Sequence, residues 1–110
     1  MMTLAAVVLA VSLQEASAPP AVTAAPALAQ SHIGQGIVLY KKRHFRAARD
    51  EFRKAVDADP SSAAANYYLG YTLYKIGEPT RRLTPEKEQS RGLFARAFEL
   101  DPSFRPTWRP

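Results

Sequence analysis

An internal repeat is the feature that most constrains the fold of this chain. One group of residues recurs 34 positions later in the sequence: Gly36, Leu39, Tyr40 and Lys41 return as Gly70, Leu73, Tyr74 and Lys75. A second group recurs 42 positions later: Arg49, Phe52, Ala55, Asp59, Pro60 and Ser61 return as Arg91, Phe94, Ala97, Asp101, Pro102 and Ser103. Self-similarity at such a period is typical of folds built from stacked units. The larger second offset indicates an eight-residue insertion, which we assign to residues 79–86.

The spacing of apolar residues within each unit is helical. Ile33, Ile37 and Tyr40 are separated by four and three positions, which places them on one face of a helix. We expect helices over about 31–42, 45–58, 62–76 and 84–101. Pro60 should end the second helix, because proline disfavours helical dihedrals at the residue before it. Ser61 or Ser62 should cap the third helix, and Thr84-Pro85-Glu86 should open the fourth. The sequence therefore predicts an all-α fold of antiparallel helix-turn-helix units.

A helix-turn-helix unit of this length that ends in Asp-Pro resembles the tetratricopeptide repeat. The residues that carry the resemblance are Gly36, Ala48, Phe52, Ala55 and Asp59-Pro60 in the first unit, and Leu69-Gly70, Ser90, Phe94, Ala97 and Asp101-Pro102 in the second. The resemblance implies an α-solenoid with units at about 31–62 and 63–103. The glycines and small residues would lie where helices approach closest, with Phe52 and Phe94 filling the space between them.

About three repeats are usually needed for a stable stack, and this chain offers two and a C-terminal stub. The stub, residues 103–108, looks like the start of a third unit. We expect Phe104 and Trp108 to fold back as a short cap, or a second copy of the chain to continue the stack. A tail that does not pack is the alternative.

The first 29 residues differ in composition from the rest. Glu15 is their only charged side chain, and Leu4–Leu13 is an apolar run too short to span a bilayer as a helix. Possible cleavage sites follow Ala18 and Ala29, as in a secretory signal peptide, although a basic segment before the apolar run is missing. We expect cleavage after Ala29, an exported protein in the periplasm or outside the cell, and a mature domain of residues 30–110. A disordered tail on a cytosolic protein is the alternative.

The residues of a catalytic or metal site do not come together in the sequence. The chain of 110 residues carries a formal charge of +5 and no cysteine, so thiolate chemistry and disulfides are excluded. His32 and His44 lack the spacing of paired metal ligands. Gly34-Gln35-Gly36 begins like a dinucleotide fingerprint, but Leu39 replaces the third glycine and no strand precedes it. We therefore expect no enzyme activity, no cofactor and no metal.

The resemblance implies a binding surface on the concave side, formed by the first helix of each unit. The matching positions are Ile33, Ile37, Tyr40, Lys41, Tyr67, Tyr71, Tyr74 and Lys75. Such a groove would bind a peptide or protein partner, with Tyr67 and Tyr71 as its main contacts and Tyr40 and Tyr74 serving packing. Basic residues flank it: Lys42, Arg43, Arg46, Arg81 and Arg82. A self-assembling subunit and a basic binder of polyanions are the alternatives; nucleic acid is an improbable partner, and a stable membrane anchor is not expected.

Overall fold

The computed structural model describes residues 21–106, which form helices joined by loops. The helices are α2 (Ala21–Lys41), α3 (Phe45–Ala58), α4 (Ala63–Gly77) and α5 (Pro85–Leu100). Within this range there is no strand, as the helical spacing of apolar residues predicts. The all-α fold is thus confirmed.

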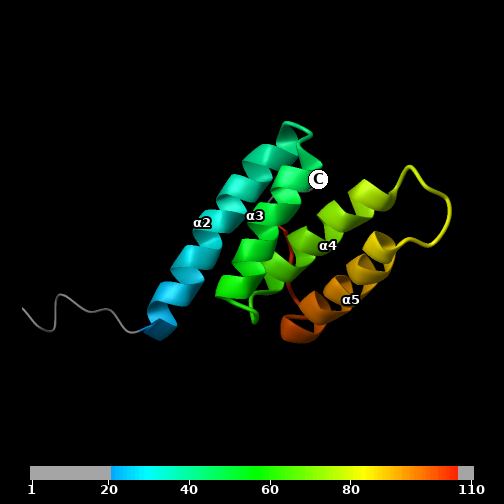
Figure 1. Ribbon diagram of the computed structural model, residues 1–110. Helices are drawn as coiled ribbons and strands as arrows, with labels where there is room; N and C mark the ends of the chain where they lie inside the picture. Colours follow the sequence, from blue (N-terminus) through cyan, green and yellow to red (C-terminus); the bar gives the residue numbers. More distant parts are fainter. Residues whose placement is uncertain (1–20, 107–110) are drawn as a thin grey trace, which may run out of the picture.

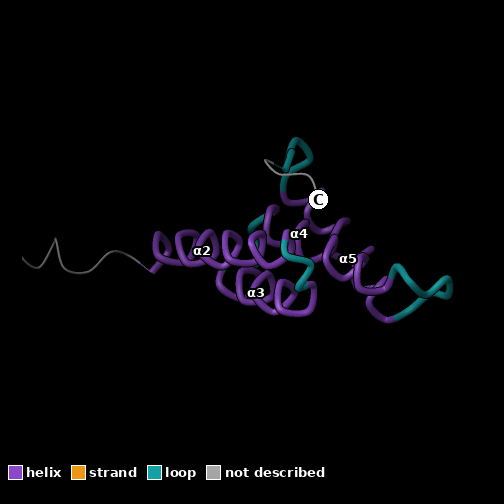
Figure 2. The backbone as a smooth tube through the Cα atoms, turned by 90° about the horizontal axis from the view of Figure 1, so that it is seen from above, coloured by secondary structure: helices purple, strands orange, loops and turns teal. Residues whose placement is uncertain are grey.

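The helices form two antiparallel pairs that stack on each other (Figure 1). The chain reverses between α2 and α3, and again between α4 and α5, so that each pair is one helix-turn-helix unit. The two units meet mainly where α3 packs against α4, while α2 touches α4 less extensively. Viewed from above, α3 lies on one side of α2 and α4 (Figure 2). The opposite side is therefore formed by α2 and α4, the first helices of the two units.

The core is built around Phe52, whose side chain is fully buried. Its ring stacks on that of Tyr68, with centroids 5.6 Å apart, and so joins α3 to α4. Gly36 and Gly70 lie where the helices of each pair approach closest. A Cβ atom at Gly36 would meet the Phe52 ring, and one at Gly70 would contact Phe94. The small residues and the two phenylalanines have the packing roles that the repeat predicts.

Side chains and turns delimit the helices as expected. The hydroxyls of Ser62 and Thr84 accept hydrogen bonds from the amides of Ala65 and Lys87, and so cap α4 and α5. The two Asp-Pro-Ser turns are alike in geometry. Asp59 accepts hydrogen bonds from the amide and hydroxyl of Ser61, and Asp101 accepts the same pair from Ser103. The repeat is therefore one of local structure as well as of sequence.

The first helix is longer than the apolar spacing predicts. We expected it to begin near Ser31, but α2 begins at Ala21 and contains Pro26. Ala29 is 2% exposed and belongs to the core, and a domain that begins at residue 30, as we expected, would lack this core residue. Residues 1–20 lie outside the described range.

The insertion and the C-terminal segment also have defined places. Relative to the first unit, α4 ends two residues later and α5 begins two residues earlier, so both helices absorb part of the insertion. The other inserted residues lie in the loop 78–84.

After α5 the chain turns back, and Phe104 packs with its ring centroid 5.5 Å from that of Tyr67. The predicted cap is present at Phe104, whereas Trp108 lies outside the described residues.

Candidate binding surfaces

The surface shared by α2 and α4 carries the predicted groove residues at matching helical positions. Ile33, Ile37 and Tyr40 on α2 correspond to Tyr67, Tyr71 and Tyr74 on α4 at the offset of 34. The α2 members are mostly interior: Ile33 is 5% and Tyr40 is 8% exposed, and Ile37 is half-buried against the core. Most of the accessible surface among these six residues therefore comes from α4.

The tyrosines of α4 form a row linked by ring contacts. The Tyr71 ring lies 6.3 Å from the rings of both Tyr67 and Tyr74, and 6.1 Å from that of Tyr40. The row is also anchored to α5, because Tyr67 and Tyr71 both contact Phe94. Tyr67 and Tyr71 are consequently half-buried. Tyr74 is 45% exposed, so it does not have the packing role that we expected for it.

Burial changes the acidity of one tyrosine in this region. Tyr40 lies beneath the row and packs edge-on against Phe45, with centroids 4.9 Å apart. Desolvation by burial, and then the nearby Tyr71, raise the pKa of Tyr40 to about 12. Tyr40 is therefore a neutral core residue at physiological pH.

A hollow of 280 Å³ opens beside the tyrosine row, between residues 30–37 of α2 and the N-terminal half of α4. Its walls include Ile33 and Ile37 from the predicted groove, and Tyr68 from α4. Phe104 closes one side. The C-terminal segment thus forms part of the surface on which the predicted groove lies, a contribution that the repeat pattern does not reveal.

The predicted basic edge of the groove includes a lysine that is already paired with a carboxylate. Lys41 and Lys75 hold corresponding positions at the ends of α2 and α4. Lys75 forms an ion pair with Glu78, with Nζ and Oε2 3.2 Å apart. Lys41 is exposed.

A cleft of 670 Å³ lies between the α2–α3 turn and the C-terminal end of α4. We call it the turn cleft. Its lining residues are Arg43, His44, Phe45, Arg46, Ala47, Lys75, Ile76, Glu78 and Pro79. It brings Arg43 and Arg46, two of the predicted basic contacts, to the same cavity as the end of α4. Lys42 is exposed next to them in the sequence.

The turn that forms one wall of this cleft is well defined by backbone hydrogen bonds. The amide of His44 donates to the carbonyl of Leu39 at 3.0 Å, and the amide of Arg43 donates to that of Tyr40 at 2.9 Å. This pair of bonds is the Schellman arrangement that ends many helices. Arg43 occupies its left-handed position with a φ of 65°, where glycine is the usual residue.

The other predicted basic contacts lie on the loop 78–84. Arg81 and Arg82 are exposed and are not part of the turn cleft. The Lys87 ammonium donates hydrogen bonds to the carbonyls of Thr80 and Arg82, at 3.0 Å for the latter, and so ties the loop to α5. The structure therefore separates the basic residues into a group at the α2–α3 turn and a group on the loop.

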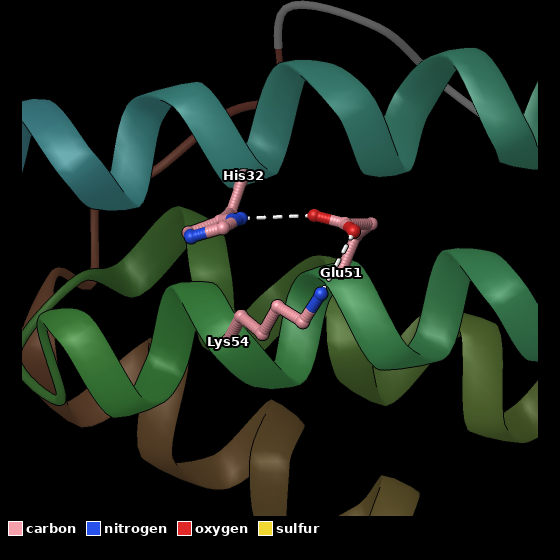
Figure 3. A network of polar contacts seen from close by, with 3 residues as sticks. All are labelled: His32, Glu51 and Lys54. Atoms are coloured by element: carbon pink, nitrogen blue, oxygen red, sulfur yellow. Dashed lines mark hydrogen bonds and ion pairs between the residues drawn. The ribbon is translucent and has the colours of Figure 1, made fainter.

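A polar contact joins α2 to α3 (Figure 3). The Nδ1 atom of His32 lies 2.9 Å from Oε2 of Glu51, and Lys54 lies 3.2 Å from the other carboxylate oxygen. The hydrogen bond from His32, followed by the bond and charge of Lys54, lowers the pKa of Glu51 despite its partial burial. His32 thus has a partner across the helix pair, which the sequence pattern did not indicate.

Residues 21–106 give no indication of two other kinds of site. In this part of the chain, no group of three or more histidine and acidic side chains is arranged to hold a metal ion. Nor do its helices include one with the length and apolar character needed to cross a membrane.

Comparison with known proteins identifies related sequences. The family model described as tetratricopeptide repeat matches residues 33–81. Superkiller complex protein 3 of Mus musculus is 34% identical over 80 residues, which cover 73% of this chain. Tetratricopeptide repeat protein 37 of Xenopus laevis is 29% identical over 75 residues, or 68% of this chain. The chain spans 5% of the length of each of these relatives.

Proposed function

We propose, since this chain belongs to the tetratricopeptide repeat family, that it binds a peptide or protein partner on the surface formed by α2 and α4. Members of this family are generally interaction scaffolds rather than enzymes. The name of the mouse relative describes a protein of a complex, which accords with a binding role. The partner of this chain is a separate question, because the similarity covers a small part of that relative.

The observation that carries the proposal is the tyrosine row of α4. Its inner members are held by Phe94 and Tyr40, while Tyr74 is 45% exposed at its end. A ring that is positioned by its neighbours loses little freedom on binding, and tyrosine offers both apolar area and a hydroxyl. The adjoining hollow of 280 Å³ provides space for a side chain of the partner.

The test should change the exposed end of the row without disturbing the core. Tyr67→Ala or Tyr71→Ala would remove contacts to Phe94, so either variant would weaken the fold as well as binding. Tyr74→Glu avoids this, because its side chain is largely outside the core. Val38→Glu is a matched control, since Val38 is 52% exposed on α2 and is not packed against the core.

Both variants and the unaltered chain would be used to capture partners from extracts of the source organism. A partner identified with the unaltered chain should bind Tyr74→Glu at least about tenfold more weakly by calorimetry and bind Val38→Glu normally. Equal affinity of Tyr74→Glu and the unaltered chain would contradict the proposal. Circular dichroism melting of each variant establishes that its fold is intact.

A second candidate is self-assembly through the outer face of α5. Phe98 is 67% exposed there, beside a hollow of 190 Å³ that Phe104 also lines. Stacked repeats bury such faces against the next unit. If copies associate in this way, the mass measured by light scattering rises with concentration, and Phe98→Glu prevents the rise. A monomer at all concentrations would exclude this candidate.

The outer face of α2 gives less support to stacking. Ala65 and Leu69 of α4 are buried, and their counterparts on α2 at the offset of 34 are Ser31 and Gln35, which are exposed. A polar outer face is typical of a terminal repeat that faces solvent. Binding of a different protein on the α2–α4 surface therefore remains the leading proposal.

A further inference from the structure

The turn cleft is lined by residues other than those of the tyrosine row, and it combines residues of both repeat units. The α2–α3 turn and the start of α3 supply one wall, and the last residues of α4 with Pro79 supply the other. Its volume of 670 Å³ falls within the range of about 300–1,000 Å³ that is usual for ligand sites. The cleft is therefore large enough to accept the side chains of a bound segment.

Part of the lining is apolar. Phe45 is half-buried and is fixed in place by its edge-on contact with Tyr40 at 4.9 Å. Ile76 is also half-buried, and Ala47 and Pro79 are exposed beside them. An apolar side chain that entered the cleft would remove this surface from water, which is favourable in proportion to the area covered.

The charged part of the lining is mainly basic. Arg43, Arg46 and Lys75 face one acidic residue, Glu78, whose carboxylate already pairs with Lys75 at 3.2 Å. Within residues 21–106, no carboxylate lies at ion-pair distance from Arg43 or Arg46. Arg49 has such a partner in Asp50 at 3.1 Å, and Arg96 has one in Glu99 at 3.8 Å. The cleft thus holds two guanidinium groups that lack an acidic partner within the described chain.

The backbone at Arg43 adds to this picture. Its φ of 65° is unfavourable for a residue with a side chain, and glycine at this position would form the same turn at lower cost. The turn geometry therefore gives no reason for an arginine here. Recognition of a ligand carboxylate by the guanidinium group at the rim of the cleft would be such a reason, because arginine binds carboxylates through paired hydrogen bonds.

We propose that the turn cleft is a docking site for an acidic segment of a partner protein, in which carboxylates flank a bulky apolar side chain. The apolar side chain would lie on Phe45 and Ile76, and the carboxylates would pair with Arg43 and Arg46. A nucleic acid fits less well, because single strands are bound by successive exposed aromatic faces and a continuous basic track. The inference rests on the proposed function in one respect, namely that the ligand is a protein segment.

The probe for the test is a fluorescently labelled peptide in which single phenylalanines alternate with pairs of glutamates, used with the full chain. We expect saturable binding by fluorescence anisotropy, weakened by added salt because the contacts are partly ionic. Two control peptides carry glutamine for glutamate, or alanine for phenylalanine. Each should bind at least about tenfold more weakly, since each lacks one of the two kinds of contact.

The protein variant for the test is Arg43→Gly with Arg46→Gln. Glycine retains the left-handed turn, so a loss of peptide affinity in this variant reflects the missing guanidinium groups rather than unfolding. We expect affinity to fall about tenfold or more. The matched control is Arg53→Gln with Arg91→Gln, which removes the same charge from exposed arginines outside the cleft and should bind the peptide normally.

Three results would overturn the proposal: no saturable binding of the glutamate–phenylalanine peptide, equal weakening in the cleft and control variants, or tighter cleft-dependent binding of a single-stranded RNA competitor. Tyr74→Ala separates the two proposals, since it adds no carboxylate beside Lys75 and Glu78 of the cleft. It should leave affinity for this peptide unchanged, whereas it should weaken binding of the partner that contacts α2 and α4. Failure at one surface is thus visible independently of the other.

Discussion

The ring of Phe52 lies against the backbone of Gly36, so that a Cβ atom at residue 36 would stand 2.5 Å from Cε1 of the ring. The ring is fully buried and is also stacked on Tyr68, so it has no free space into which to move. This contact fixes how closely α2 and α3 approach, and through Tyr68 it connects the first unit to α4. Glycine at residue 36 is therefore a requirement of packing.

Gly36→Ala should lower the free energy of unfolding by roughly 1–3 kcal/mol, because a methyl group overpacks a filled core. Gly34→Ala is the matched control on the same helix, since a Cβ atom there would meet nothing within 4 Å. It should instead stabilise the protein by about 0.5–1 kcal/mol through helix propensity. Urea denaturation measures both, and equal effects of the two substitutions would contradict the packing described.

Arg43→Gly should stabilise the fold by about 0.5–1 kcal/mol, because residue 43 has a left-handed backbone that glycine adopts without strain. Arg46→Gly is a suitable comparison, since Arg46 lies in the first turn of α3 and glycine disfavours a helix. The comparison variant should be less stable than the unaltered chain. Thermal melting shows whether each variant is more or less stable than the unaltered chain. A less stable Arg43→Gly variant would show that the guanidinium group stabilises the turn.

Much of the fold follows from the sequence because its determinants are local. Proline and hydroxyl residues delimit helices through the dihedrals and amides of their neighbours, and the prediction succeeds at Pro60, Ser62 and Thr84. The start of α2 was predicted too late because the apolar spacing on which the prediction rests begins at Ile33. The helix instead begins at Ala21 and continues through Pro26, although proline there supplies no amide for a helical hydrogen bond.

The binding surfaces were less predictable because they depend on how the units approach each other. The repeat placed Tyr67, Tyr71 and Tyr74 on one face, but their exposure is set by Phe94 of α5 and by the returning C-terminal segment. The turn cleft likewise forms between residues more than 25 positions apart, such as Arg46 and Lys75. Its basic residues were identified individually, whereas the cavity that joins them to Ile76 requires the tertiary structure.

The hydrogen bond between His32 and Glu51 predicts a pH-dependent contribution to stability. The pKa of Glu51 is lowered by folding, so its contribution is present above the pKa of the unfolded chain and is lost as pH falls through the folded value. Glu51→Gln should reduce stability by about 0.5–1.5 kcal/mol at pH 7 and by little below about pH 4. The control is Asp57→Asn, an exposed carboxylate on the same helix, for which urea midpoints should change little at either pH.

The extent of α2 predicts the effect of removing the N-terminal residues. A chain that begins at Gln30 lacks the buried methyl group of Ala29 and the first turns of α2. Compared with a chain that begins at Pro20, it should be less stable by about 1 kcal/mol, the value of one buried methyl group. Equal stability of the two chains would show that this part of α2 does not contribute to the free energy of unfolding.

Export remains a prediction. Intact-mass analysis of the cellular protein tests it, since retention of residues 4–13 would contradict it.

Shortening the loop between α4 and α5 should separate its structural residues from its dispensable ones. Thr84 caps α5 by accepting a hydrogen bond from the Lys87 amide, and Pro85 occupies the first turn, so both should be kept. Residues 79–83 are exposed. Two of their carbonyls, those of Thr80 and Arg82, accept hydrogen bonds from the Lys87 side chain.

Replacement of residues 79–83 by two glycines should therefore change the free energy of unfolding by less than about 1 kcal/mol. Thr84→Ala, which leaves the loop intact, should cost about 1 kcal/mol because the cap is lost. The shortened loop also removes Pro79 from the turn cleft, so affinity for the glutamate–phenylalanine peptide should fall while Tyr74-dependent binding persists. Circular dichroism melting and fluorescence anisotropy on the same samples measure these effects. The roles assigned to the loop and the cap would be contradicted if the shortened chain unfolds while Thr84→Ala leaves the stability unchanged.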